Sequence, residues 1–288
     1  MKTILVTGAG SGIGKATTLA LAKVGHTVFA CDKETNFEAF EKIPNIIPFQ
    51  VDVTKQEEVN SVVAMISSKG SLDVLINNAG VGLFGPTIEL PLNRIKGLFD
   101  VNLFGYIVFA QACFELLKKN KGLIINISST QAHIYLLQYL GAYNMSKSAV
   151  ETLSNILRTE LQKFGIRVCV VNPGGYATDI YYKAVDDIKK WAKESMYYKE
   201  ELVTFNENYH PGKIGRDPAI IGQDIMNIVE SDNPPEAFIS GTEEIKKFVY
   251  EANITRLVQL MQSSTKDLDP KDFILNTIEK NSLESTIN

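Results

Sequence analysis

The sequence contains few cysteines, and none of them forms a recognisable pattern. Cys31, Cys113 and Cys169 are spread over 288 residues and lie in apolar segments. Because there is no Cys-x-x-Cys pair and no Cys/His cluster, neither a disulfide framework nor a structural zinc site is indicated, and no metal ligands are predicted. We interpret the three cysteines as small buried residues in a reducing compartment.

Long apolar runs and long basic runs are also missing. No stretch approaches the roughly 18 to 20 unbroken apolar residues that cross a membrane. The first ten residues, MKTILVTGAG, are too short for the core of a signal peptide. We therefore expect a cytoplasmic protein without a membrane partner. The formal net charge of -4, with no basic cluster, argues against nucleic acid as a partner.

Hydrophobic residues make up 45% of the chain, which is enough for a large core, and they are arranged in an alternating pattern. Short apolar runs predict strands at 4–6, 27–31, 46–51, 74–76, 123–127 and 167–171. Longer amphipathic segments predict helices at 12–24, 55–68, 93–119 and 142–164. This βαβα order predicts an α/β fold of the Rossmann type, a doubly wound parallel sheet of about seven strands with helices on both faces.

The pattern changes after residue 180. Asp217 as N-cap and Pro218 at the first helical position predict a helix to about residue 230. Residues 238–239 are candidates for the seventh strand, and one further helix is possible from residue 270. We expect residues 1–260 to form a single domain and 261–288 a polar C-terminal extension.

A glycine-rich turn lies between the first strand and the first helix. Gly8, Gly12 and Gly14 stand in the sequence TGAGSGIG. Such a turn lets backbone approach a pyrophosphate, and the helix N-terminus supplies N–H groups and a partial positive charge. The spacing is not literally GxGxxG, and a tight turn without a ligand is the alternative. Asp32 follows Gly14 by 18 residues, where a carboxylate that binds ribose is expected, although a solvated loop acid would also fit.

Tyr143 and Lys147 are spaced i and i+4 at the start of a predicted helix, so both point to one face. The same spacing recurs at Tyr209 and Lys213, but Pro211 makes a continuous helix there unfavourable. A free tyrosine has a pKa near 10, and lowering that pKa by about 3 units requires roughly 4 kcal/mol. A neighbouring ammonium group favours the phenolate, so the pair is suited to proton transfer.

Several ordered motifs in the first two thirds of the chain resemble those of the classical short-chain dehydrogenases/reductases. The resemblance runs from residue 3 to about 180. The motifs are TGAGSGIG at 7–14, VDV at 51–53, NNAG at 77–80, VN at 101–102, INISS at 125–129, YNMSK at 143–147 and VNPGGYAT at 171–178. The resemblance implies an NAD-dependent oxidoreductase that interconverts an alcohol and a ketone or aldehyde by hydride transfer.

The resemblance also implies roles for individual residues. Tyr143 would be the general acid/base, Lys147 would bind the nicotinamide ribose and lower the tyrosine pKa, and Asn102 would hold a water of a proton relay. The implied cofactor-binding residues are Gly8, Ser11, Gly12, Ile13, Gly14, Asp32, Asp52, Val53, Asn77, Ala79, Gly80, Tyr143, Lys147, Pro173, Gly174, Tyr176 and Thr178. Because Asp32 would repel a 2′-phosphate, we expect NAD, with NADP less favoured, although Lys33 and Lys15 could offset part of that repulsion.

The substrate-binding serine departs from the family pattern. Ser129 precedes Tyr143 by 14 residues, one more than is usual, whereas Thr130 has the usual spacing. The motif INISS places a serine at the end of a strand, so Ser129 is the preferred candidate for the hydrogen bond to the substrate oxygen. Ser128 is a candidate for local capping or packing.

A hydrophobic substrate is expected, because apolar and aromatic residues follow NNAG, separate Ser129 from Tyr143, and fill 181–198. By the resemblance, 181–215 would be a lid over the substrate; many of these side chains could equally pack the lid itself. The family forms dimers or tetramers through the helices predicted here at 93–119 and 142–164, so a homodimer or homotetramer is expected. The apolar stripes on these helices would equally well pack into the core of a monomer. The alternatives are a dinucleotide-sensing or scaffold protein on the same fold, or a sugar-nucleotide-modifying relative.

Overall fold

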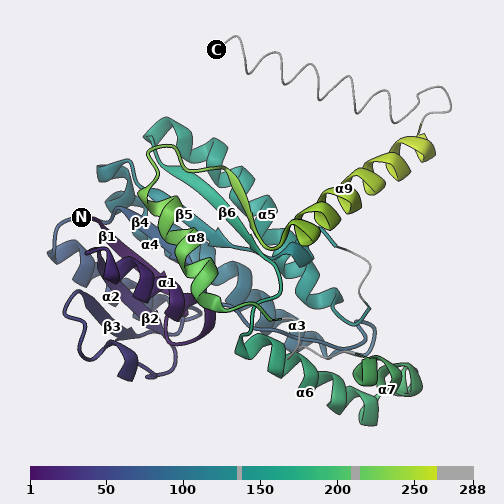
Figure 1. The fold of residues 1–288 in the computed structure, drawn as a ribbon. Helices are drawn as coiled ribbons and strands as arrows, with labels where there is room; N and C mark the ends of the chain where they lie inside the picture. The colour runs from purple at the N-terminus through teal and green to yellow at the C-terminus, as the bar shows by residue number, and fades with distance from the viewer. Residues whose placement is uncertain (135–137, 209–214, 265–288) are drawn as a thin grey trace. The chain divides into compact units, whose positions relative to one another are not determined.

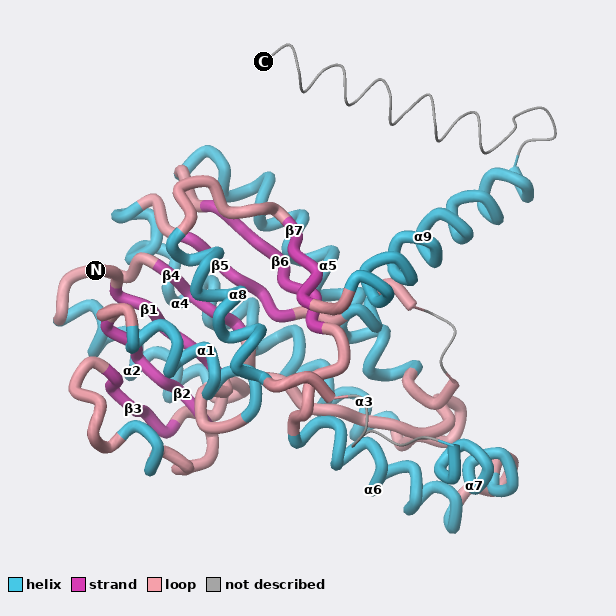
Figure 2. Tube along the Cα trace, in the orientation of Figure 1, coloured by secondary structure: helices cyan, strands magenta, loops and turns pink. Residues whose placement is uncertain are grey.

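The computed structural model describes residues 1–134, 138–208 and 215–264. The chain divides into two compact units, Met1–Gly241 and Thr242–Asn288. The first unit is built on one sheet (Figures 1 and 2). Its strands are β1 (Thr3–Thr7), β2 (Thr27–Asp32), β3 (Ile46–Gln50), β4 (Val74–Asn77), β5 (Leu123–Ile127), β6 (Arg167–Pro173) and β7 (Ala237–Ser240).

The strand order is β3-β2-β1-β4-β5-β6-β7, and every neighbouring pair is parallel. The fold predicted from the alternation of apolar and amphipathic segments is therefore confirmed, including the seventh strand. Because the chain winds outward from β1 in both directions, a crevice opens at the carboxyl ends of the strands next to β1.

Helices cover both faces of the sheet, as Figure 1 shows. They are α1 (Gly12–Lys23) and α8 (Pro218–Glu230) on one face, and α2 (Gln56–Ser68), α4 (Gly105–Asn120) and α5 (Gly141–Leu161) on the other. Alternate residues of β1 reach opposite faces: Ile4 and Val6 join the core under α1 and α8, and Leu5 joins the core under α2 and α4. Both faces of each central strand are thus buried, which explains the unbroken apolar runs.

The long helix predicted at 93–119 has an interruption. It consists of α3 (Leu92–Phe99), a π-helical turn η2 (Asp100–Phe104) and α4. Within the described residues, Leu92–Asn120 is the one helix that is long and apolar enough to cross a membrane by length and composition alone. Phe109, Cys113 and Leu117 of this helix are fully buried in the core of the sheet, as expected of a core helix.

Residues 179–208 contain two helices that the sequence pattern did not predict, α6 (Asp179–Glu194) and α7 (Lys199–Asn208). The N-cap predicted for α8 is confirmed, because the Asp217 side chain accepts a hydrogen bond from the backbone N–H of Ala219. In the second unit, α9 (Glu243–Ser264) crosses the boundary expected at residue 260. The helix considered possible from residue 270 lies outside the described residues. The lid role of 181–215 stays a prediction.

Candidate active site

A cavity of about 610 Å³ opens at the carboxyl ends of the strands. The turn between β1 and α1 forms one wall, and the ends of β2, β4, β5 and β6 form others, together with the first turns of α5 and α6. The cavity thus occupies the crevice in which open parallel sheets bind ligands.

The glycine turn brings backbone close to backbone. Gly8 and Gly12 have φ values of 66° and 50°, in the left-handed region that favours glycine. A Cβ on Gly14 would lie only 1.9 Å from the carbonyl oxygen of Gly8, so no side chain fits there. At the start of α1, Ser11 makes no side-chain cap bond and the first turn contains no acid, so no side chain of the helix itself neutralises the partial positive charge that faces the cavity. This cradle fits the pyrophosphate of a dinucleotide.

Asp32 ends β2 and lines the same cavity. Its Oδ2 accepts the Gly10 N–H at 2.8 Å, and its Oδ1 accepts the Glu34 N–H at 3.0 Å. These bonds fix the carboxylate at the cavity wall. Each carboxylate oxygen can accept a further hydrogen bond, so the arrangement also fits a ribose diol.

Asp52 also lies in the cavity wall and holds a lysine. Lys33 Nζ is 3.1 Å from Asp52 Oδ2, and the Thr54 hydroxyl donates to Asp52 Oδ1 at 2.7 Å. Burial by itself would raise the pKa of Asp52, but hydrogen bonds from Thr54 and Lys33 outweigh it and hold that pKa below its ordinary value. The positive charge of Lys33 is therefore directed to Asp52.

Lys147 lies under the ring of Tyr143. The ammonium Nζ donates to the backbone carbonyl of Ile127 at 2.8 Å and is 6.0 Å from the centroid of the Tyr143 ring. The Tyr106 hydroxyl donates to the same carbonyl at 3.0 Å. Burial lowers the pKa of Lys147 from 10.5 to about 8, and the negative charge of Glu151 opposes that shift. Burial therefore brings the pKa of Lys147 closer to the neutral range, next to a tyrosine that lines the cavity.

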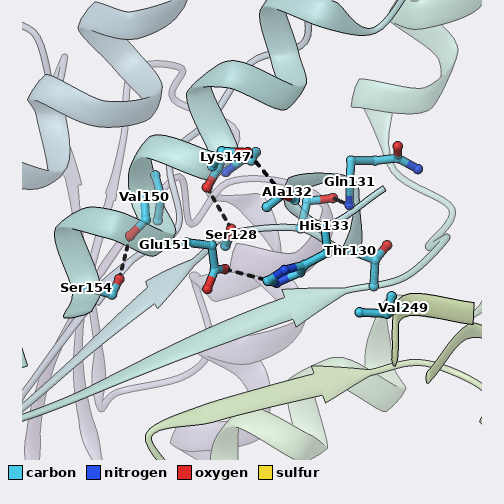
Figure 3. Close-up of polar contacts among 12 residues, drawn as sticks. Ser128, Thr130, Gln131, Ala132, His133, Lys147, Val150, Glu151, Ser154 and Val249 are labelled. Carbon is cyan, nitrogen blue, oxygen red and sulfur yellow. Dashed lines mark hydrogen bonds and ion pairs between the residues drawn. The ribbon is translucent and has the colours of Figure 1, made fainter. Parts of the chain in front are cut away.

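The three candidate hydroxyls after β5 have different partners. Ser128 donates to the backbone carbonyl of Lys147 at 3.1 Å (Figure 3), and Thr130 donates to the carbonyl of Pro173 at 3.2 Å. Ser129 lines the cavity, and its oxygen accepts the Gln131 N–H at 3.2 Å. In the described part of the chain, the Ser129 hydroxyl proton has no acceptor. Of the three, Ser129 is the hydroxyl that can donate to a ligand without breaking a bond.

Asn102 lies in the π-helical turn η2, where its side chain makes three hydrogen bonds. Its Oδ1 accepts the Val81 N–H at 2.8 Å, while its Nδ2 donates to the Val81 carbonyl and the Ser146 hydroxyl, both at 3.0 Å. Ser146 in turn donates to the Tyr143 carbonyl at 2.8 Å. Asn102 thus joins the segment after β4 to the first turn of α5. A π-turn often marks a functional position.

Most of the residues expected at the site line the cavity. Gly14, Asn77 and Asn102 do not. Gly14 packs against Gly8, and Asn77 donates to Asn126 Oδ1 inside the sheet at 2.9 Å. The cavity also contains residues that the sequence reasoning missed, among them Gly10, Asn78, Gln131, Ile180 and Lys183. The i and i+3 spacing of the last two would have placed them on one helix face, had α6 been predicted.

The apolar residues proposed for the substrate pocket divide into two groups. Val81, Phe84 and Leu140 line the cavity, and the Phe84 ring is 5.7 Å from that of Tyr143. Trp191 is buried between α6 and α7, and Tyr197 is exposed. Residues 135–137 of the expected pocket lie outside the described part of the chain.

Comparison with known proteins agrees with this geometry. Residues 2–189 match the family model described as short chain dehydrogenase. Estradiol 17-beta-dehydrogenase 2 of Rattus norvegicus is 34% identical over 261 residues, 83% of this chain and 68% of that protein. A 3-ketodihydrosphingosine reductase of Bacteroides thetaiotaomicron is 33% identical over 235 residues, 81% of this chain and 85% of that protein.

Solved structures share the fold. A short chain dehydrogenase from Burkholderia cenocepacia, in complex with NADP, superposes with a TM-score of 0.70 at 22% identity, covering 92% of this chain and 98% of that chain. The family match spans well over half of the chain and includes every strand end that borders the cavity. The chain therefore belongs to the short-chain dehydrogenase/reductase family and is an NAD(P)-dependent oxidoreductase that acts on hydroxyl or carbonyl groups.

Proposed function

We propose that the protein interconverts a hydrophobic alcohol and its ketone or aldehyde, prefers NAD, and uses Tyr143 as general acid/base. One observation carries the proposal: a buried lysine with a pKa lowered to about 8 lies 6.0 Å from the ring of a tyrosine that lines the dinucleotide cavity. Perturbed lysines in such positions favour proton transfer near neutral pH.

The residues present would hold the dinucleotide along the cavity. The turn Gly8–Gly14 would bind the pyrophosphate, Asp32 the adenosine ribose, and Lys147 the nicotinamide ribose. The bound nicotinamide would supply or accept the hydride. Tyr143 would give its hydroxyl proton to the carbonyl oxygen during reduction and take it back during oxidation. Ser129 would donate a hydrogen bond to that oxygen, and Asn102 would position the first turn of α5 through Ser146.

The proposed substrate class rests on the apolar residues that line the cavity. Val81, Phe84, Leu140 and Ile180 form an apolar surface next to Tyr143, which favours a hydrophobic alcohol or ketone. Two relatives are named for estradiol and for 3-ketodihydrosphingosine, and both names support a largely apolar substrate. Lys183 and Gln131 also line the cavity and would contact polar groups of the substrate or cofactor.

A homodimer or homotetramer is also proposed. Phe104 and Ile156, on or beside α4 and α5, are about half exposed, at 50% and 48%. Large apolar side chains on an exposed helix pair are suited to an interface between copies of the chain. Light scattering coupled to gel filtration measures the mass in solution, and a monomeric mass would refute this part of the proposal.

The decisive experiment is a substrate screen with NADH and NADPH. Medium-length or cyclic apolar ketones should be reduced faster than small polar sugars, and faster with NADH than with NADPH. Nicotinamide absorbance measures each rate. Faster turnover of the sugars would contradict the substrate class, and turnover of neither class with either cofactor would contradict the proposed reaction.

A further inference from the structure

A second carboxylate, separate from those of the cofactor wall, lies behind the proposed catalytic residues. Glu151 follows Lys147 by one turn of α5, and its side chain is only 16% exposed. Its Oε1 is buried and accepts no hydrogen bond from the residues that the structure describes. A carboxylate held this far from water needs an opposite charge nearby.

His133 provides that charge when its imidazole is protonated. His133 Nε2 lies 3.8 Å from Glu151 Oε1, and the imidazole is 24% exposed (Figure 3). His133 directly follows the short helix η3 (Thr130–Ala132), which begins after Ser129. Histidine is the side chain that most readily changes its charge between pH 5 and 8.

The His133–Glu151 pair spans a junction that matters for the proposed reaction. On one side is the segment that carries Ser129, and on the other is α5, which carries Tyr143 and Lys147. Besides the bond from the Lys147 ammonium to the Ile127 carbonyl, three neutral side-chain bonds join the described residues on the two sides of this junction. They run from Ser148 Oγ to the Ala132 carbonyl at 3.0 Å, from Asn144 Nδ2 to the Ile134 carbonyl at 3.1 Å, and from Ser128 Oγ to the Lys147 carbonyl at 3.1 Å.

The charge of Glu151 also acts along the helix on Lys147. Burial lowers the pKa of Lys147 to about 8, and Glu151 opposes this effect. The carboxylate also acts on the buried thiol of Cys169 in β6, whose pKa burial raises to about 12. Glu151 is therefore close enough to influence one group on α5 and one on β6.

Charged groups on the other elements packed against α5 have partners of their own or are exposed. Arg94 of α3 lies near Asp187, and Asp100 of η2 and Lys163 of η4 (Gln162–Phe164) are exposed. On α5 itself, Arg158 lies near Glu236. Arg167 at the start of β6 donates to the Asp232 carbonyl, and β5 contains no ionisable residue. In the described residues, His133 is thus the cation across the junction that faces Glu151.

We propose that His133 and Glu151 are a positioning pair that holds the Ser129 segment in register with Tyr143, with the Glu151 carboxylate one helical turn from Lys147. The proposal rests on the function proposed above, in which Tyr143 and Lys147 act in proton transfer. Neither His133 nor Glu151 lines the described cavity, so both act through other residues.

The test compares the pH profiles of carbonyl reduction in Glu151→Gln and His133→Gln. The alkaline limb of kcat/KM should move to lower pH by about 0.5–1.5 units in Glu151→Gln, because Lys147 loses the charge that favours its ammonium form. It should not move to lower pH in His133→Gln, because the carboxylate remains. Both variants should lose about three- to tenfold in kcat at their optimum, because the Ser129 segment is less well held.

Glu160→Gln is the matched control, since it removes an exposed carboxylate from the same helix. Its pH profile should match the parent. Glu151→Asp keeps the charge and should retain the parent's alkaline limb, which also tests the inference if Glu151→Gln fails to fold. Three results would each overturn the inference. The pH profile of Glu151→Gln could match that of Glu160→Gln, the alkaline limb of Glu151→Asp could move to lower pH as far as that of Glu151→Gln, or His133→Gln could keep the full kcat of the parent.

Lys147→Ala separates this inference from the proposed function. If Lys147→Ala keeps the parent rate, the proposed function fails. If Lys147→Ala is inactive while Glu151→Gln behaves like Glu160→Gln, only the positioning pair fails. Binding of NADH, followed by its fluorescence, shows whether each variant retains a folded cofactor site.

Discussion

Replacing Asp32 by asparagine tests cofactor choice with the least structural change. The asparagine side chain would still offer one carbonyl oxygen to the Gly10 or Glu34 N–H groups, which the carboxylate now accepts at 2.8 and 3.0 Å. What disappears is the negative charge at the ribose end of the cavity. The substitution should therefore increase the use of NADP relative to NAD without disturbing the glycine turn.

The size of the preference for NAD over NADP follows from the distance between the Asp32 carboxylate and the additional phosphate of NADP. A phosphate on the ribose that Asp32 is proposed to bind would lie about 4 Å from the carboxylate, where two like charges cost roughly 1 kcal/mol in water and about 4 kcal/mol at an effective dielectric of 20. Asp32 is half-buried, so the cost lies between these limits. The parent should prefer NAD by roughly fivefold to a thousandfold, and Asp32→Asn should remove most of that preference.

Lys33 does not cancel this repulsion, because its ammonium lies 3.1 Å from Asp52. Asp52→Asn is the companion variant: it releases Lys33, which is 71% exposed, and should raise relative NADP use by only a few fold. The assay is kcat/KM with each cofactor at matched ionic strength. Equal efficiency with both cofactors in the parent, or no gain in relative NADP use in Asp32→Asn, would refute the assignment of Asp32.

Four further predictions follow from the site. Tyr143→Phe should lower kcat by at least about a hundredfold and leave NADH binding nearly unchanged, because the hydroxyl acts mainly in the transition state; turnover within about tenfold of the parent would contradict the role of Tyr143. Because burial lowers the pKa of Lys147 to about 8, the unfolded chain binds that proton more tightly than the folded protein does. The free energy of unfolding of Lys147→Met minus that of the parent should therefore fall by about 3 kcal/mol from pH 8 to pH 10.5, because the parent becomes more stable over this range. Denaturant titrations at both pH values would measure this difference. Gly14→Ala should destabilise by about 1–3 kcal/mol, because its Cβ would meet the Gly8 carbonyl, whereas Gly97→Ala, with open space around it, should be neutral or stabilising in the same thermal melts. Phe84→Ala should raise KM for apolar ketones about tenfold and affect small polar ones less, and equal effects on both would show that Phe84 does not contact the substrate.

The sheet could be predicted from the sequence because its strands are buried on both faces. In such strands nearly every residue is apolar, so runs such as Ile4–Val6 are visible without knowledge of their neighbours. The position of the cavity has the same origin, since parallel strands place their carboxyl ends at one edge of the sheet. The α6 helix was missed although its apolar residues, among them Ile188, Trp191 and Ala192, lie on one face, whereas the short and charge-rich α7 has only a weak apolar stripe.

Side-chain partners that are distant in sequence could not be predicted. The sequence leaves open that Lys33 could reach a phosphate, but Lys33 lies against Asp52, 19 residues further on. His133 likewise faces Glu151 across the junction between η3 and α5, 18 residues further on in the sequence. Such pairs depend on how the helices and strands are placed relative to one another, and the spacing of residues within one element does not predict these contacts.

The position of Lys147 depends on the core of the sheet more than on any loop. Its Nζ and the Tyr106 hydroxyl donate to the same carbonyl, that of Ile127 at the end of β5. Tyr106 is 1% exposed and Lys147 is 3% exposed, so both donors are held by close packing. The apolar wall beside Tyr143, in contrast, comes partly from α6, which supplies Ile180. Substitutions on α6 should therefore change which substrate fits while leaving Lys147 and its hydrogen bond in place, so substrate choice and proton transfer can vary separately in this fold.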